Sequence, residues 1–370
     1  MKLQISQENL SKAVSLAARF TSSRAQLPIL GNILLTVNKN KLNVSSTNLE
    51  VSVSSQIAAK VDSEGEISIP SKVLLEIVSN LPKETLTLES DKEQLKINTS
   101  SFSSKVLGMN TSDFPKIPTS LGKEKSLTLS SSKFFEALGK VLFSTSVDET
   151  RPILTGVLFI LSKDSLTLVS TDGFRLSRKI ISVDGGKLEN LKVILPKFVL
   201  SEINRSSDSS EVSFEIQDKE KQALFGLEDI VLSSRILEGE YPDFEKIIPK
   251  TSVCSVTLDK EDFLRAIKLA APFARDNSNI VKIKILKGSI NVLAESSQAG
   301  NQEMKVDAKV EGESSNFEIS FNFKFLEDFL NSVKGDEIKM DFVSTDKAGI
   351  FLDTSDKDYL HLIMPVRVQS

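Results

Sequence analysis

The sequence is poor in the side chains on which most catalytic and metal sites depend. Its 370 residues include one cysteine, Cys254, and one histidine, His361. A single cysteine excludes an internal disulfide and is typical of a protein in a reducing cytoplasm. A single histidine leaves little material for a histidine-based triad or a metal cluster. A lone histidine near a C-terminus is usually a surface residue or a satisfied hydrogen-bonding partner.

The common signatures of nucleotide, metal and redox sites are also missing. The chain contains no GxxxxGK(S/T), GxGxxG, HExxH or CxxC motif. Ser130 and Lys133 have a Ser-x-x-Lys spacing, but serine is a natural cap for the helix expected there. Asp and Glu are plentiful and form no motif, so an enzyme with an unrecognised carboxylate site stays open as an alternative. We expect a protein with no catalytic activity, no metal and no cofactor.

Long apolar runs and strong net charge are absent as well. The longest apolar run, Val157–Leu161, is far shorter than the roughly 20 residues that a membrane span needs. The N-terminus, MKLQISQENLSKA, lacks the apolar core of a secretory signal. We therefore expect a cytoplasmic protein with no membrane partner. The formal net charge of −4 argues against binding nucleic acid through bulk positive charge, although a local basic surface stays open.

What the sequence does contain is an internal repeat. LPILGNILLTV (Leu27–Val37) returns as RPILTGVLFIL (Arg151–Leu161), 124 residues later, and 8 of the 21 positions from Leu27 to Thr47 are identical at this offset. A further 124 residues leads to VKIKILKGSINVLAE (Val281–Glu295), which keeps the apolar pattern. Solenoid repeats run only about 20–50 residues, so this period indicates tandem domains.

Each copy has the same order of elements. A first helix is expected from amphipathic spacing, as at Leu10, Ala13, Val14 and Ala17, and a shorter second helix follows later in the copy. Alternating segments such as KLNVSS and TLTLES predict strands. Each copy is therefore predicted to be α+β, with two helices backed by antiparallel sheets. The expected first helices are Glu8–Phe20, Lys133–Phe143 and Glu261–Phe273; the second are within Ile69–Leu81, Leu195–Arg205 and Phe321–Val333.

The predicted helices carry slightly more basic than acidic residues. Such faces are ordinarily just solvated, and they gain a nucleic-acid role only if the fold places the helices around one axis. The basic residues are Lys12, Arg19, Lys133, Lys140, Arg265 and Lys268 on the first helices, and Lys72, Lys197, Arg205, Lys324 and Lys334 on or beside the second.

Five segments spread along essentially the whole chain carry a more specific signal than the repeat alone. They are LPILGNILL (Leu27–Leu35), STDGFRLSR (Ser170–Arg178), EGEYPDFEKIIP (Glu238–Pro249), FNFKFLEDFL (Phe321–Leu330) and YLHLIMPVRV (Tyr359–Val368). Together with the three repeats, they resemble the bacterial DNA polymerase III β subunit, the sliding clamp family. The resemblance implies three DNA-clamp domains, expected at residues 1–121, 122–250 and 251–370.

The resemblance also implies an assembly and a function. In the family, two chains close head to tail into a six-domain ring, with helices around the hole and sheets on the rim. Duplex DNA passes through without sequence readout, and the ring tethers the replicative polymerase for processive synthesis. The dimer edge is expected at Ser103–Met109 of one chain and near Lys268–Phe273 and Asp276–Ile280 of the other. The DNA-binding residues are expected to be Arg24, Lys72, Lys197 and Arg205.

A hydrophobic peptide groove between the second and third domains is implied in the same way. In the family, the DNA polymerase III α subunit, the clamp loader, other DNA polymerases and repair proteins insert a short motif there. This chain departs from the family pattern at Phe174, where His or another polar-tipped ring is frequent, at Lys246, and in the extra residues Gln369 and Ser370. The residues carried over are Leu154, Thr171, Gly173, Phe174, Arg175, Leu176, Pro242, Ile247, Asn322, Phe325, Met364, Pro365, Val366 and Arg367.

Two other hypotheses are kept beside the sliding clamp. One is the carboxylate enzyme mentioned above. The other is a tandem-domain scaffold that never encircles DNA, such as a diverged clamp paralogue. Retention on circular DNA with loss from linear DNA separates the clamp from the scaffold.

Overall fold

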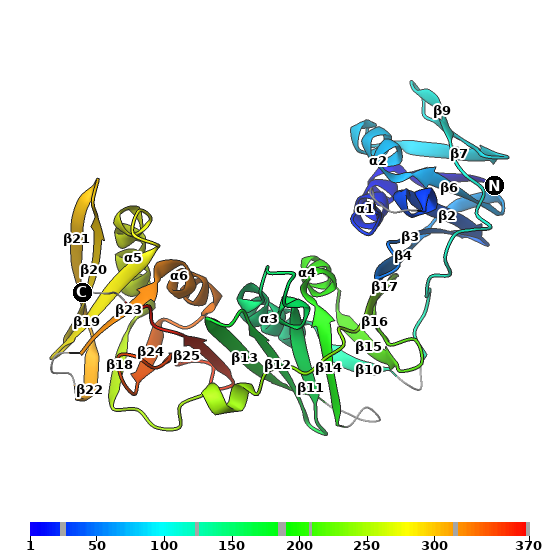
Figure 1. Cartoon of the computed structure of the whole chain (residues 1–370). Coiled ribbons are helices and arrows are strands. Elements are labelled where there is room, and N and C mark those ends of the chain that lie inside the picture. Colours follow the sequence, from blue (N-terminus) through cyan, green and yellow to red (C-terminus); the bar gives the residue numbers. More distant parts are fainter. Residues whose placement is uncertain (23–26, 123–125, 184–189, 207–208, 314–316, 368–370) are drawn as a thin grey trace. The chain divides into compact units, whose positions relative to one another are not determined.

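The computed structural model describes residues 1–22, 27–122, 126–183, 190–206, 209–313 and 317–367 (Figure 1). The chain divides into two compact units. The first unit comprises Met1–Ser131 and Arg205–Ile236, and the second comprises Ser132–Asn204 and Leu237–Ser370. Each unit therefore combines residues from two copies of the sequence repeat.

The described residues contain six α-helices, two in each copy of the repeat, as predicted. The observed helices lie within about two residues of the predicted spans at most ends, because their amphipathic spacing is a local signal. Side-chain caps stop fraying at several N-termini; Asp259, for example, accepts a hydrogen bond from the Asp262 amide at 2.8 Å. The helices are α1 (Gln7–Ala18), α2 (Ser71–Asn80), α3 (Ser131–Val141), α4 (Lys197–Arg205), α5 (Lys260–Ala274) and α6 (Phe323–Ser332).

The first unit holds two antiparallel sheets. One has the order β5-β1-β7-β8-β9, and the other has the order β10-β15-β16-β17-β4-β3-β2-β6. Their strands are β1 (Lys2–Ser6), β2 (Asn32–Asn38), β3 (Lys41–Thr47), β4 (Val51–Ala58), β5 (Lys60–Ser63), β6 (Gly65–Pro70), β7 (Thr85–Asp91), β8 (Gln94–Asn98), β9 (Ser103–Leu107), β10 (Leu127–Ser130), β15 (Glu211–Gln217), β16 (Gln222–Leu227) and β17 (Ile230–Arg235).

The second unit also holds two antiparallel sheets. Their orders are β14-β11-β12-β13-β26-β25-β24-β18-β22 and β21-β20-β19-β23. Their strands are β11 (Gly156–Leu161), β12 (Ser165–Thr171), β13 (Arg175–Ser182), β14 (Leu191–Pro196), β18 (Cys254–Asp259), β19 (Ile280–Leu286), β20 (Ser289–Ser296), β21 (Gly300–Asp307), β22 (Lys309–Gly312), β23 (Phe317–Asn322), β24 (Glu337–Phe342), β25 (Gly349–Asp353) and β26 (Tyr359–Ile363).

The repeated segments that opened the sequence comparison fold alike. Pro28–Gly31 forms a 3₁₀ turn that leads into β2, and Pro152–Thr155 forms the same turn before β11. In both, proline occupies an early position of the turn, where its missing N–H costs no hydrogen bond. Two further 3₁₀ turns are η2 (Leu142–Ser144) and η4 (Phe244–Ile247).

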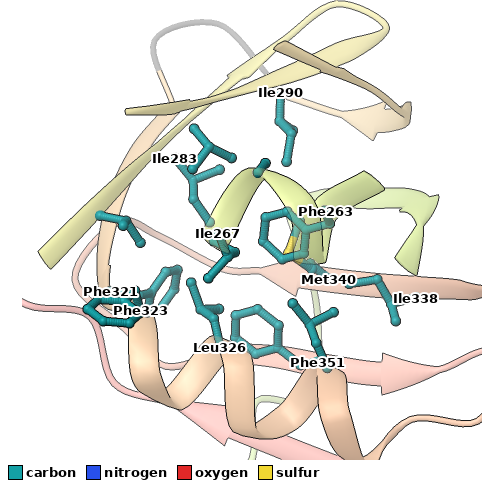
Figure 2. Packing of buried hydrophobic residues seen from close by; sticks show 14 of the residues in the cluster. Phe263, Ile267, Ile283, Ile290, Phe321, Phe323, Leu326, Ile338, Met340 and Phe351 are labelled. Carbon is teal, nitrogen blue, oxygen red and sulfur yellow. The ribbon is translucent and has the colours of Figure 1, made fainter. Parts of the chain in front are cut away.

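In the second unit, α5 and α6 share one core with the sheets around them. Figure 2 shows Phe263 and Ile267 of α5 directed toward the same apolar space as Leu326 of α6. Phe351 of β25 joins this cluster, with its ring at 5.6 Å from Phe329. Burying each such aromatic or aliphatic side chain contributes about 1.5–3 kcal/mol, so this shared core stabilises the third copy.

Each long sheet joins strands from two copies of the repeat. In the first unit, β17 pairs with β4, with Leu232 opposite Val53. In the second unit, β26 pairs with β13, with His361 opposite Ser177. The repeat places β4 and β13 at equivalent positions, and likewise β17 and β26. The same joint between copies is therefore built twice within one chain.

Candidate peptide and nucleic-acid interfaces

The turn between β12 and β13 presents an aromatic side chain to solvent. Asp172 Oδ1 accepts hydrogen bonds from the Phe174 and Arg175 amides at 2.9 and 3.0 Å. Gly173 has a φ of 95°, a conformation that glycine adopts without a steric penalty. The Thr171 hydroxyl closes the turn by donating to the Arg175 carbonyl at 2.6 Å. This local bonding fixes the turn and leaves Phe174 60% exposed.

The segment after β26 is anchored beside that turn. The Met364 amide donates to the Phe174 carbonyl, and the Val366 amide donates to the Ser320 carbonyl, both at 2.8 Å. Met364 is 38% exposed, while Pro365 and Val366 are half-buried and Arg367 is exposed. The backbone of this segment is therefore held in place, and the Met364 side chain is free to contact a ligand.

A buried apolar cluster contains Leu176 and Leu362, each two residues from these exposed side chains in the sequence. Leu154 and Leu176, both predicted groove residues, are buried members of it, so they also serve as core. Ile247, at the end of η4, is 47% exposed, and its neighbour Phe244 is buried in the cluster. Phe174, Ile247 and Met364 are exposed, and each lies within three residues of a member of this cluster; exposed apolar side chains of this kind bind hydrophobic partners. The cluster comprises Leu154, Leu158, Val169, Leu176, Ile194, Tyr241, Phe244, Ile350, Leu360 and Leu362.

Arg175 differs from the other predicted groove residues because the protein's own groups occupy its guanidinium. It pairs with Asp172 at 3.0 Å and with Asp328 at 2.5 Å, and it donates to the Phe143 carbonyl at 2.7 Å. Its guanidinium also lies 4.4 Å from the centre of the Phe325 ring. Arg175 is therefore held by the protein's own groups, and Phe325 packs against its guanidinium.

The remaining predicted residues fall into two groups. Asn322 caps α6, since its side chain accepts a hydrogen bond from the Lys324 amide at 3.0 Å. Pro242 is exposed just before η4. The sequence interpretation missed Leu360 and Leu362, which face the apolar cluster from β26. The alternation in YLHLIM is the signal that could have identified them.

The predicted DNA-binding residues are placed less uniformly. Arg24 lies outside the described residues. Lys72, on α2, and Arg205, at the end of α4, are exposed, whereas Lys197, at the start of α4, is half-buried. Burial, together with the positive charge of Arg175, lowers the pKa of Lys197. Lys140, one of the basic helix residues, is buried and paired with acids, so it belongs to no solvated basic face.

His361 is fully buried in the second unit, so the expectation of a surface residue is wrong and that of a satisfied partner is right for one nitrogen. Its Nδ1 lies 2.8 Å from the Ser177 Oγ, and its ring stacks on Phe329 with centroids 5.5 Å apart. Its Nε2 has no hydrogen-bond partner among the described residues. Burial is the main cause that lowers the pKa of His361 to about 3, and the positive charge of Arg175 adds to it.

This histidine makes stability depend on pH. In the unfolded chain the pKa of this histidine is about 6.5. Below that pH the imidazole is protonated in the unfolded state but stays neutral in the folded state. Stability is therefore expected to fall as the pH drops from about 6.5 toward 3, by ~2 kcal/mol between pH 7 and pH 5. Urea titrations of the wild type and of His361→Asn at both pH values measure this share. Equal losses in the two proteins would contradict it.

Within the described ranges, no helix is long and apolar enough to cross a membrane. The same residues contain no group of three or more His, Cys, Asp or Glu side chains that could hold a metal ion.

Known proteins match this chain along its whole length. Models of the DNA polymerase III beta subunit match at residues 1–118 (N-terminal domain), 128–243 (central domain) and 245–367 (C-terminal domain). The beta sliding clamp of a Synechocystis species is 31% identical over an alignment of 394 residues that covers all of both chains. That of Staphylococcus epidermidis is 29% identical over 94% of each chain. The crystal structure of the DNA polymerase sliding clamp from Bacillus subtilis is 26% identical, with a TM-score of 0.93 over the whole of both chains.

The resemblance read from the five segments is thereby confirmed, as is the fold of three tandem α+β clamp domains with antiparallel sheets. The chain belongs to the DNA polymerase III beta subunit family, the bacterial sliding clamps.

Proposed function

We propose that two copies of this chain close into a ring that encircles duplex DNA and tethers the replicative polymerase for processive synthesis. The ring acts in the cytoplasm, without a cofactor and without catalytic activity of its own. Its three clamp domains span residues 1–121, 122–250 and 251–370. The observation that carries the proposal concerns the joint between copies of the repeat. This joint forms twice within the chain, and the two strands that could form it a third time each lie at the edge of a sheet.

The two edge strands are β9 and β21. β9 is the counterpart of β17 and β26, and β21 is the counterpart of β4 and β13. Each terminates its sheet within the described part of the chain. An edge strand presents unpaired N–H and C=O groups and readily accepts another strand. Pairing of β21 with β9 of a second copy repeats the joint a third time and supports a head-to-tail dimer.

The register of the existing joints fixes the register of the proposed one. Leu232 faces Val53, and His361 faces Ser177. Leu88 faces Ile97, which faces Ser104, so Ser104 of β9 has the position of Leu232 and His361. Ala294 faces Gln302, so Gln302 of β21 has the position of Val53 and Ser177.

The side chains at these two positions support the pairing. Ser104 Oγ and Gln302 Oε1 are both shielded from solvent, and neither has a hydrogen-bond partner among the described residues. A hydrogen bond between Ser104 and Gln302 of two copies satisfies both atoms, and leaving them unpaired costs about 1–3 kcal/mol each.

The helix beside β21 carries a matching apolar residue. The tenth residue of each first helix is Leu16 in α1, Lys140 in α3 and Leu269 in α5. Leu16 and Lys140 are 7% and 2% exposed, whereas Leu269 is 51% exposed. Coverage of Leu269 by a second copy accounts for this difference.

Replacing Leu269 with glutamate is expected to weaken dimerisation at least ~100-fold, because a carboxylate would be buried in the joint without a partner. Sedimentation velocity over a concentration series measures the dissociation constant. Val73→Glu, a matched change at another exposed apolar side chain on a helix, is the control. Equal dissociation constants for the two variants would contradict the assignment of this edge.

The proposed contact with DNA is weak and sequence-independent. The chain is acidic overall, so overall repulsion disfavours tight binding, while exposed cations such as Lys72 and Arg205 make loose phosphate contacts. We include Arg24 and Lys197 in this set because they are carried over from the family. Loose contacts suit a ring that holds DNA by topology and must move along it.

A retention experiment tests encirclement. Protein loaded on nicked circular DNA by a clamp loader is expected to stay bound in 0.3 M salt, a condition under which loose phosphate contacts are screened. Cutting the circle once is expected to release most of it. Equal retention on circular and linear DNA would favour the scaffold hypothesis.

We further propose that the apolar surface around Phe174 and Met364 is the peptide groove for the DNA polymerase III α subunit, the clamp loader, and other polymerases and repair proteins. Its flexible Met364 suits several partners, because a methionine side chain adapts to differently shaped ligands. The residues of the groove are the fourteen carried over from the family, with Arg175, Asn322 and Phe325 in supporting positions.

A further inference from the structure

The joint between β13 and β26 contains a buried set of charges. Lys179 donates to both oxygens of Asp356, at 2.6 and 2.8 Å, and Lys140 donates to the same carboxylate. Lys140 also lies 3.6 Å from Asp353 and 3.4 Å from Glu136. The side chains of Lys140 and Asp353 are 3% and 0% exposed. The pairs connect the second copy, which supplies both lysines, to the third, which supplies both aspartates.

The lysine positions are charged in this joint alone. Lys140 corresponds to Leu16 and Leu269, as given above. Lys179 faces Leu168 across β12 and β13, and the same position in the other copies is Ser55, facing Val44, and Met304, facing Val292. Of the two joints within the chain and the proposed third joint, only the one with β26 contains a pair of lysines.

The position of Asp353 is likewise acidic in this joint alone. Asp353 lies two residues after Phe351, which faces His361. The equivalent positions are Thr99, two residues after Ile97, and Leu227, two residues after Phe225. The turn before β17 does carry Asp229, but this residue forms an exposed pair with Lys41 at 3.7 Å, whereas Asp353 and Asp356 meet buried lysines.

Buried ion sets are weak evidence for stability, because removing the charges from water costs about as much as the pairing returns. Their best-attested use is to select one arrangement among alternatives. This chain has such alternatives. The strands β9, β17 and β26 are homologous, each can add to the edge of β4, β13 or β21 through backbone hydrogen bonds, and a wrong choice yields open chains instead of a closed assembly.

We propose that the Lys140–Lys179–Asp353–Asp356 set selects the strand partner, directing β26 to β13 and reserving β21 for β9 of a second copy. Pairing of β9 or β17 with β13 removes Asp353 and Asp356 from the two buried lysines and leaves Lys140 with only Glu136 of its own helix. Pairing of β26 with β4 or β21 buries two carboxylates against Leu16 and Ser55, or against Leu269 and Met304. The part that concerns β21 rests on the proposed homodimer.

The test is refolding of the full chain, because strands choose their partners anew when they leave denaturant. The neutral variant carries Lys140→Leu, Lys179→Ser, Asp353→Asn and Asp356→Asn, the first two being the residues of copy one. After dilution from urea, native mass spectrometry gives the distribution of assemblies. The ratio of larger assemblies to the wild-type species is expected to rise about tenfold, or ~1.4 kcal/mol, with far-UV circular dichroism unchanged.

A control removes the same charges from the surface. The variant with Lys284→Gln, Lys309→Gln, Glu311→Gln and Glu318→Gln loses exposed ion pairs of 3.1 and 2.7 Å, and the longer contact of Glu318 with Lys282 at 3.9 Å. It is expected to refold into the wild-type species. A neutral variant that also refolds into the single wild-type species would overturn the proposal.

A charge swap decides the matter if the neutral variant does not regain its secondary structure. Lys140→Glu together with Lys179→Glu is expected to misassemble, and adding Asp353→Lys and Asp356→Lys is expected to restore the wild-type distribution. A quadruple variant no better than the double one would overturn the proposal. The wild type alone tests the homodimer: if it is monomeric, that proposal fails, while partner selection is still decided by whether the neutral variant gains larger species.

Discussion

Replacing Asp356 with alanine is expected to lower the free energy of unfolding by about 3–5 kcal/mol, the largest single-residue effect on stability that we predict. The change removes the carboxylate that both Lys140 and Lys179 contact. Lys140 and Lys179 are 3% and 9% exposed, so water cannot replace it. Two buried ammonium groups would be left with only the more distant Asp353 and Glu136. Urea unfolding at pH 7 measures the loss.

The sign of the pH effect follows from the same contacts. Burial acts to raise the pKa of Asp356, but hydrogen bonds from Lys140 and Lys179 outweigh it and hold the pKa below its usual value. The stabilisation is therefore present above the ordinary aspartate pKa and is lost as the pH falls through the lowered one.

An exposed ion pair provides the control for this prediction. Asp243 pairs with Lys246 at 2.8 Å on the surface, with the two side chains 56% and 83% exposed. Asp243→Ala is expected to change stability by less than about 1 kcal/mol, as is usual for surface pairs. Similar losses for Asp243→Ala and Asp356→Ala would show that the buried set is not coupled as described.

Deleting Met364–Ser370 is expected to weaken binding of a hydrophobic peptide from the DNA polymerase III α subunit more than ~100-fold, equivalent to about 2.7 kcal/mol. The deletion removes the Met364 side chain and the backbone that joins Phe174 to Ser320. It leaves β26 intact, because that strand ends at Ile363. The dimer and the buried charges are therefore expected to persist, and fluorescence polarisation with a labelled peptide reports the loss.

Single changes separate the groove from general damage. Phe174→Ala is expected to weaken the same peptide about tenfold, because it removes an exposed ring beside Met364. Val253→Ala truncates another apolar side chain of the second unit, which is 45% exposed, and is expected to have no effect. Normal peptide binding by the deletion variant, with an unchanged dimer mass, would refute the location of the groove.

Local features of the fold could be predicted from the sequence. The amphipathic spacing of Glu8–Phe20 predicted α1, observed at Gln7–Ala18, because side chains three and four residues apart share one helix face. The repeat of LPIL and RPIL predicted equivalent segments in two copies, and both segments form a 3₁₀ turn. Such patterns involve neighbours in sequence, so one chain is enough to reveal them.

Contacts between distant segments could not be predicted in this way. Lys140 was counted with the basic helix residues, because a lysine on a helix is ordinarily solvated; its partner Asp356 lies 216 residues away. Arg175 was carried over as a groove residue, but its partner Asp328 is 153 residues distant. In both cases the charge partner comes from another copy of the repeat, and it is identified only when β13 pairs with β26.

The resemblance predicted the members of the candidate site but not the role of each one. Resemblance supplied Phe174 and Met364, which lie together on the exposed apolar surface. It could not separate ligand-facing from supporting residues, since that distinction depends on burial and on which groups already have partners. The equivalence of β9 and β21 to strands that are already paired also required the sheet order.

The measurement that tests the central claim most directly is negative-stain electron microscopy of the purified full chain at concentrations above the dissociation constant of the dimer. Closed rings with a central hole and six lobes are the predicted result, since each chain contributes three domains and two copies complete the circle. Three-lobed, open particles at every concentration would contradict the ring, and with it the proposal that this protein holds DNA by encircling it.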